Sequence, residues 1–133
     1  MTYFDVPEEK AITAYKGMHV ANDGSMYSMY CQPVQSRGPH FYDVGKSYHE
    51  SYVRLCVSGY HCCLLIADVL DYHPNIRLSA YAEVKIWGKL DVGDDKIAAE
   101  YIHIVKRVNP FEIHAQQQSR FQRYPAMLEY LNP

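Results

Sequence analysis

The chain has 133 residues, of which 48% are hydrophobic and 21% are charged, and its formal net charge is -2. This length suits one domain of the usual roughly 100–200 residues, and the composition excludes a disordered tail or a fibrous repeat. The small net charge excludes a long-range field that would attract nucleic acid or an anionic membrane. Thirteen tyrosines against four phenylalanines are the one unusual feature, and tyrosine suits half-buried strands and contact surfaces.

The sequence carries no sign of a secretory leader or of a membrane span. Three acidic residues and one lysine occupy the first ten positions, and no apolar region follows them, as a signal peptide would require. The longest apolar run, 62–67, is six residues long, whereas a bilayer needs about 20. We therefore expect a cytoplasmic protein with reduced cysteines.

Strand and turn signals alternate along the first half of the chain. Residues 1–10 are typical of a loosely held lead-in. Strand-forming residues, bounded by turn or breaker residues, then predict four extended segments, 12–18, 25–32, 40–48 and 53–57.

The second half begins with helical spacing and returns to strands. Hydrophobic residues recur at helical spacing from Cys62 to Tyr72, before a proline, which predicts one helix of about three turns. Residues 80–87 alternate, with Ala82, Val84 and Ile86 on one side, and 98–108 carries Ile102 and Ile104 as one inward row. The polar residues 91–95 between them predict a solvated turn, in which Asp91 is one of three aspartates.

The clustering of strands predicts an α+β fold: a mainly antiparallel sheet, one central helix and a C-terminal helical segment. We expect a single domain over 1–133. After the lead-in it has a core at 14–108 and a helical extension at 109–133, where Phe121, Tyr124, Leu128 and Leu131 form one stripe.

The segment Gly59 to Cys63, with a histidine beside two cysteines, has the densest set of reactive side chains. At a helix N-terminus a cysteine can become a nucleophilic thiolate. The other interpretation is that Cys62 and Cys63 are small core residues at a junction between strand and helix. A zinc site would use Cys56, His61, Cys62 and Cys63. Adjacent cysteines lack the spacing of such a site, so no metal is expected. The usual glycine motifs for dinucleotides, phosphates and serine hydrolases do not occur.

Several short blocks, read in order, resemble a small domain family that is found largely in bacteriophage and prophage proteins and is known only as a domain of unknown function. These blocks are Ala14–Met18, Tyr42–Tyr48, Gly59–Cys63, Asp68–Tyr72, Tyr81–Val84 and Gly93–Ala99. The resemblance spans roughly 14–108.

The same order of blocks is loosely similar to ADP-ribosyltransferase folds. That similarity implies a basic residue that grips NAD, an aromatic residue near the nicotinamide and a glutamate that steadies an oxocarbenium ion. The matching positions are Lys16, Tyr60 and Glu83. Lys16 departs from the arginine or histidine of that pattern. For Lys16 and Glu83 the alternative interpretation is an exposed row on a strand.

The resemblance to phage proteins leads us to expect a small interaction protein without catalysis or cofactor. It would bind a host or defence-system protein, and homodimerisation is a further expectation. The alternative is an NAD- or nucleotide-binding protein with the three residues above. Candidate contacts with a protein partner are four tyrosines in segments rich in aromatic residues, Tyr27, Tyr30, Tyr42 and Tyr48. Core packing is the other interpretation of these rings.

Overall fold

The alternating pattern in the second half of the chain forms the centre of the fold. The computed structural model describes residues 2–29 and 39–118. In it β7 (Ser79–Val92) pairs antiparallel with β8 (Ile97–Arg107). The inward rows of both strands are buried, as the period of two predicts: Ala82, Val84, Ile86, Ile102 and Ile104. The register between the two strands shifts at two points. Such bulges increase twist, which helps the sheet to curl.

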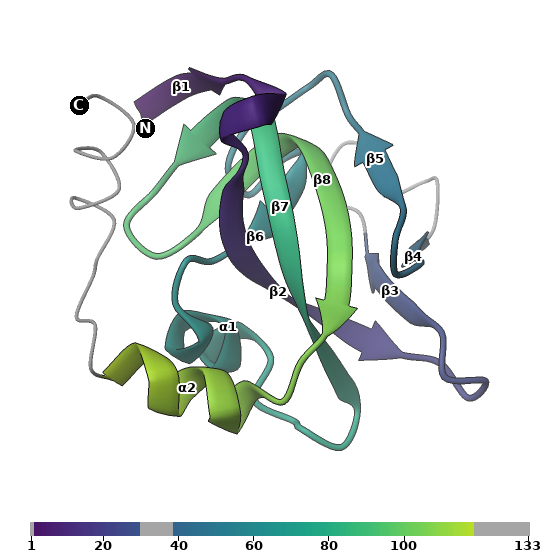
Figure 1. Ribbon diagram of the computed structural model, residues 1–133. Coiled ribbons are helices and arrows are strands. Elements are labelled where there is room, and N and C mark those ends of the chain that lie inside the picture. Colours follow the sequence, from purple (N-terminus) through teal and green to yellow (C-terminus); the bar gives the residue numbers. More distant parts are fainter. Residues whose placement is uncertain (1, 30–38, 119–133) are drawn as a thin grey trace.

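Two shorter strands follow one another along each outer edge of this central pair. Along β7 run β1 (Thr2–Val6) and β2 (Ile12–Val20). Along β8 run β5 (Ser47–His49) and β6 (Tyr60–Cys62). All four pairings are antiparallel, so the two long strands hold the other elements in place (Figure 1).

The sheet is completed beyond β2 by β3 (Met26–Met29) and then β4 (Pro39–Tyr42). Among the described residues the sheet thus has eight strands, and it curls into a half-barrel (Figure 1). Together with the two helices described below, this confirms the α+β class, the mainly antiparallel sheet and the internal and C-terminal positions of the helices.

The curl brings β2 back to the chain that follows β6. Tyr15 and Cys63 exchange two backbone hydrogen bonds, with N···O distances of 2.7 and 2.8 Å. This bridge links the two sides of the half-barrel across its opening. Because side chains alternate along a strand, Lys16, the residue after Tyr15, faces the interior, where it is 5% exposed.

Both helices lie against the outside of the sheet, at its lower end in Figure 1. α1 (Ile66–Tyr72) and α2 (Pro110–Gln118) contribute to a second apolar cluster, made by Cys63, Ile66, Val69, Tyr81 and Ile113. α1 has no side-chain cap of its own. Instead the amide of Gln117 accepts a hydrogen bond from the Ile66 N–H (2.7 Å) and donates one to the Leu64 carbonyl (2.9 Å). α2 therefore satisfies polar groups at the start of α1 that would otherwise lack partners.

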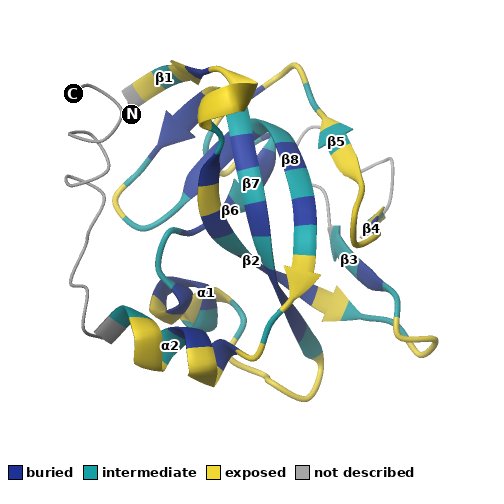
Figure 2. Cartoon of the chain, in the orientation of Figure 1, coloured by how far each residue is buried: buried dark blue, intermediate teal, exposed yellow. Residues whose placement is uncertain are grey.

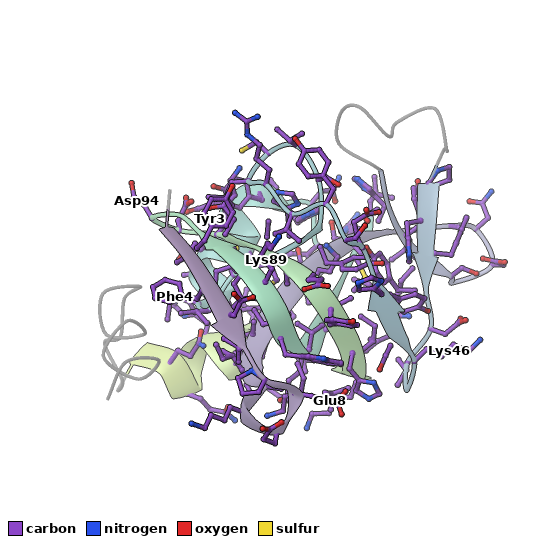
Figure 3. All side chains as sticks on the ribbon, turned by 90° about the horizontal axis from the view of Figure 1, so that it is seen from above. Tyr3, Phe4, Glu8, Lys46, Lys89 and Asp94 are labelled. Atoms are coloured by element: carbon purple, nitrogen blue, oxygen red, sulfur yellow. The ribbon has the colours of Figure 1, made fainter. Side chains whose placement is uncertain are left out.

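Burial follows this arrangement. Buried residues run along the middle of β7 and β8, and exposed residues gather at turns and on the outer faces of the helices (Figure 2). Side chains in turns, such as Glu8, Lys46 and Asp94, stand at the periphery when the molecule is seen from above (Figure 3). None of the helices within 2–29 and 39–118 has the length and apolar character needed to cross a bilayer.

The N-terminal lead-in is not loosely held. Residues 2–6 form β1, with five residues in register with β7, and Val6 is buried in the main core. Residues 8–10 form a single 3-10 turn that connects β1 to β2. The sequence pattern missed this strand because it is short and lies next to Pro7 and a run of charged residues.

The predictions for 53–57, for 62–72 and for Asp91 were also wrong in part. Residues 54–58 form a tight turn rather than a strand. The helix is shorter than expected, because Cys62 ends strand β6 and α1 begins only at Ile66. Asp91 is not in a solvated turn: it lies within β7, is fully buried and accepts a hydrogen bond from the Leu55 N–H at 2.7 Å. The stripe predicted from Phe121 to Leu131 lies outside the described residues.

Candidate functional site

The half-barrel holds a cavity of about 380 Å³, a size within the range of about 300–1,000 Å³ that is common for small-molecule sites. Its lining comes from β2, from segment 56–63 and from the end of α1, and four further residues complete it: Ser28, Tyr42, Glu50 and Lys96. Glycine is needed where segment 56–63 enters β6, because Gly59 has φ +96 and an added Cβ would meet a carbonyl oxygen at 3.2 Å.

Lys16 places a positive charge inside this cavity. Its ammonium group donates a hydrogen bond to the carbonyl oxygen of His61 at 2.6 Å and lies 5.4 Å from the centre of the Tyr42 ring. A cation over an aromatic face is attracted by the ring's negative face. Since the side chain is 5% exposed, water screens this charge little, and its field acts on whatever enters the cavity.

Aromatic rings form one wall of the cavity. Tyr42 and Tyr60 are both buried and belong to a cluster with His40 and Tyr48, in which ring centroids lie 4.3 to 6.5 Å apart. The Tyr42 hydroxyl accepts a hydrogen bond from the Ser28 hydroxyl at 3.2 Å. Edge-to-face packing of this kind holds the rings in fixed positions, so the wall is a preformed surface for an aromatic or apolar group.

His61 is fixed as a neutral ring between two backbone groups. Its Nε2 accepts a hydrogen bond from the Cys56 N–H at 2.8 Å, and its Nδ1 lies 3.2 Å from the Gly59 carbonyl oxygen, to which it donates. Burial, followed by the charges of Lys16 and Lys96, lowers the pKa of His61 to about 4. At neutral pH this ring therefore adds no charge to the cavity and serves to hold the turn at 54–58.

His73, at the end of α1, is a second neutral histidine of the lining. Burial, followed by the charges of Lys16 and His19, lowers its pKa to about 4. Its ring packs against Gly17 of β2, where an added Cβ would lie 2.4 Å from the His73 Cδ2. Only glycine thus lets α1 approach β2 this closely.

The rim of the cavity is formed by the 54–58 turn and by the end of the hairpin between β7 and β8. Lys96 Nζ lies 2.6 Å from the sulfur of Cys56 and 5.3 Å from the centre of the Tyr72 ring. The Tyr72 hydroxyl in turn contacts both carboxylate oxygens of Asp95 at 2.8 Å. The rim therefore carries a lysine, a thiol and a phenol within one connected set of contacts.

The three residues implied by the transferase likeness are not brought together. Lys16 and Tyr60 both line the cavity. Glu83 does not belong to its lining: the register of β2 with β7 pairs it with Tyr15, on the face opposite Lys16. The interpretation of Lys16 as part of an exposed row is also wrong, because the curl of the sheet turns this face inward.

The four candidate tyrosines do not form one exposed face. Tyr42 is 5% exposed, and Tyr48 and Tyr27 are half-buried, the first against the core and the second beside Phe41 with ring centroids 5.4 Å apart. Tyr30 lies outside the described residues. Among the described aromatic residues of these segments it is Phe41 on β4, at 51%, whose ring is exposed.

Cys62 and Cys63 are buried core residues, as the second interpretation of the sequence predicts. Burial raises the pKa of Cys62 to about 12, so that it stays a thiol. The nucleophile hypothesis for them was wrong, because both are buried and neither begins the helix, which starts at Ile66. In the described part of the chain, no three His, Cys, Asp or Glu side chains are grouped so as to hold a metal ion.

Four residues of the site were not predicted as such: Cys56, which was considered only as a zinc ligand, and Ser58, His73 and Lys96. All four lie in turns or at element ends, and β6, α1 and β7 lie between Cys56 and Lys96, which are 40 positions apart. Only the tertiary fold brings them together. The glycine before Tyr60 was the one usable clue, since it marks the tight turn that carries Cys56 and Ser58.

Comparisons with known proteins give a family and no activity. No curated protein and no solved structure matches the chain. A family model, described as "Domain of unknown function (DUF7666)", matches residues 12–116. This match shows neither a phage origin nor a relation to ADP-ribosyltransferases. The stretch that it covers contains every element from β2 to most of α2, and therefore the whole lining of the cavity. The chain belongs to the DUF7666 family of domains of unknown function.

Proposed function

We propose that this protein is a ligand-binding domain whose half-barrel cavity takes a small anionic molecule with a ring, nucleotides and NAD being the class to test first. The observation that carries this proposal is the placement of Lys16: a buried ammonium group beside the Tyr42 ring, in a cavity of about 380 Å³. Sites for small molecules commonly combine an apolar, aromatic lining with a few placed polar groups.

The charges of the lining favour an anion. The lining contains two lysines, Lys16 and Lys96, and one glutamate, Glu50. His61 and His73 are neutral at pH 7, because the pKa of each is lowered to about 4. A phosphate or carboxylate would gain from both lysines in a space where water screens poorly, while Tyr42 and Tyr60 offer ring faces for stacking.

Glu83 has no part in this function. In the transferase alternative it would steady an oxocarbenium ion, but it lies on the face of β7 opposite Ala82, the neighbour of Lys16. What we retain from that alternative is binding of a nucleotide-type ligand through Lys16 and Tyr60, without the glutamate's chemistry.

The test is thermal unfolding in the presence of NAD, ADP-ribose, cyclic nucleotides and mononucleotides. A ligand at 100 times its Kd stabilises the folded state by about 2.7 kcal/mol, which raises the Tm of a domain of this size by several degrees. Lys16→Met keeps the length and apolar stem of the side chain and removes its charge. We expect it to abolish the rise in Tm for every ligand that stabilises the wild type.

Glu83→Gln is the matched control, since it also removes one charge from the β2–β7 pair but on the other face of the sheet. It should keep the full ligand-dependent rise in Tm. If none of these ligands raises the Tm of the wild type, nucleotide binding is refuted. A rise that survives in Lys16→Met would refute the role of Lys16.

A second candidate function is binding of a protein partner, as the resemblance to phage proteins leads us to expect. The observation in its favour is the exposed ring of Phe41 on β4, the outermost strand of the described sheet on that side, where it packs on Tyr27. Exposed aromatic side chains on an outer strand suit pairing with another protein. A host or defence-system protein as the partner remains a prediction from that resemblance.

Light scattering over a range of concentrations tests the simplest partner, a second copy of the chain. Protein pairing through this strand predicts a dimer that Phe41→Ser converts to a monomer. Tyr3→Ser, at an equally exposed aromatic residue on β1, should leave the dimer intact. A wild type that is monomeric at all concentrations would exclude homodimerisation.

A further inference from the structure

One of the three described cysteines, Cys56, stands at the rim of the cavity. Cys56 is exposed, whereas Cys62 and Cys63 are buried. The ammonium group of Lys96 donates a hydrogen bond to its sulfur at 2.6 Å. A neighbouring cation stabilises the negative charge that sulfur must carry to act as a nucleophile, which is a common feature of reactive cysteines.

The backbone holds this thiol in a fixed position. Cys56 has φ +62, a conformation that residues other than glycine seldom adopt. Its N–H is bound by His61 Nε2, and the turn around it is closed by hydrogen bonds between Arg54 and Ser58 of 3.0 and 2.9 Å. The backbone and Cβ of Cys56 are therefore held in place, and its sulfur lies beside Lys96.

An independent observation at the same place points to a ligand. Ser58 is 3% exposed and lines the cavity, and its hydroxyl oxygen has no hydrogen-bond partner within the described residues. A buried hydroxyl without a partner costs roughly 1–3 kcal/mol. A polar group of a molecule that enters beside Cys56 would supply the missing hydrogen bond.

We propose that Cys56 is a site of mixed-disulfide formation with small disulfides that carry carboxylates. Its sulfur attacks one sulfur of the incoming disulfide, and the thiol proton passes to solvent. The disulfide bond of the reagent breaks as the new bond to Cys56 forms, and the second half leaves as a thiolate. Lys96 and the Ser58 hydroxyl favour an anionic reagent over a neutral one of the same shape.

This modification goes beyond the proposed ligand binding and does not need it. A protein that binds no nucleotide could still carry a reactive Cys56, and a nucleotide-binding protein could have an inert one. If both hold, the group attached to Cys56 stands in the rim of the cavity and blocks entry of the ligand, so that oxidation would switch binding off.

The experiment compares two aromatic disulfides, the dianionic 5,5′-dithiobis(2-nitrobenzoate) and the neutral 2,2′-dithiodipyridine. All proteins carry Cys31→Ser, because Cys31 lies outside the described residues. In the folded protein we expect one fast-reacting thiol, located at Cys56 by peptide mass spectrometry and lost in Cys56→Ser. Lys96→Met should slow the anionic reagent about tenfold, the effect of about 1.4 kcal/mol, and slow the neutral reagent much less.

Two further measurements keep the result independent of how well Lys96→Met folds. In the protein with native Lys96 and Ser58, 0.5 M KCl should slow the reaction of Cys56 with the anionic reagent, because salt screens the attraction to lysine. The reaction with the neutral reagent should be nearly unchanged. Ser58→Ala should slow only the anionic reagent. The proposal is overturned if Cys56 reacts no faster than a cysteine in the unfolded chain, or if charge on the reagent makes no difference to its rate.

Discussion

At the scale of single residues, Gly17 sets the distance between the sheet and α1. An added Cβ would lie 2.4 Å from His73 Cδ2 and 3.0 Å from Val69 Cγ1, and atoms cannot approach this closely. We predict that Gly17→Ala lowers the free energy of unfolding by about 1–3 kcal/mol, as overpacking commonly does, and urea denaturation measures the change.

A double-mutant cycle shows whether the His73 ring is the cause. In a His73→Ala background the ring is gone and Val69 Cγ1, at 3.0 Å, is the remaining close contact of the added Cβ. Gly17→Ala should therefore cost much less there than in the wild type. Equal losses in both backgrounds would contradict this account, since they would show that the penalty of the alanine has nothing to do with the ring.

His61 makes the stability of the protein depend on pH, and the sign of this dependence follows from its pKa. Its pKa is about 4 in the folded state and 6.5 in the unfolded state, so between these values the unfolded chain takes up a proton that the folded chain does not. The stability that the neutral ring contributes is complete above pH 6.5 and falls as the pH drops to 4. The loss is about 3 kcal/mol, and His73, which is more exposed, adds a smaller loss of the same sign.

Chemical denaturation at intervals from pH 7.5 to 4 measures this slope. His61→Gln, whose side-chain oxygen can still accept the Cys56 N–H, should flatten it. His103→Gln, outside the cavity lining, is the matched control and should keep it. A slope that is the same in all three proteins would show that His61 is protonated in the folded state as readily as in the unfolded one.

At the scale of elements, β1 tests whether the N-terminus belongs to the core. Val6 is 5% exposed within the main apolar cluster, whereas Tyr3, on the same strand, is 52% exposed. We predict that Val6→Ala lowers the free energy of unfolding by about 2 kcal/mol through lost burial and a small cavity. Tyr3→Ala should change it by less than about 0.5 kcal/mol.

If both substitutions lowered the free energy of unfolding by the same small amount, residues 1–10 would be loosely held, as the sequence suggests. Denaturant midpoints of the two variants, measured beside the wild type, are sufficient for this comparison, because both residues lie in one five-residue strand and differ mainly in burial.

The elements that the sequence predicts well are those with long, regular patterns. Ile102 and Ile104 in β8 and the alternating row of β7 are buried as expected, because strict alternation, as over the eight residues 80–87, fits a strand and not a helix. The sequence pattern did not predict the short elements. β6 has three residues and β1 has five, and the apolar run from Cys62 fits the end of a strand as well as the start of a helix.

At the scale of the whole molecule, the curl of the sheet decides which residues meet. The similarity to ADP-ribosyltransferase folds implied Lys16 and Tyr60 as site residues, and both line the cavity. It also suggested Glu83, which a period of two places on the opposite face of the sheet once the register with β2 is known. Lys96 and Cys56 meet only because a turn after β5 and the β7–β8 hairpin converge, and no local pattern encodes that.

We propose that the half-barrel cavity, through Lys16, accepts small anionic ring compounds. The most direct measurement is a titration of the isotope-labelled protein with 8-anilinonaphthalene-1-sulfonate, an anionic aromatic probe, followed by backbone amide NMR. We predict that the shifted amides cluster at Lys16, Gly59, Tyr60 and His61, and that Lys16→Met removes these shifts. Shifts confined to Phe41 and Tyr27 on the outer strands, or no shifts up to millimolar probe, would contradict the claim.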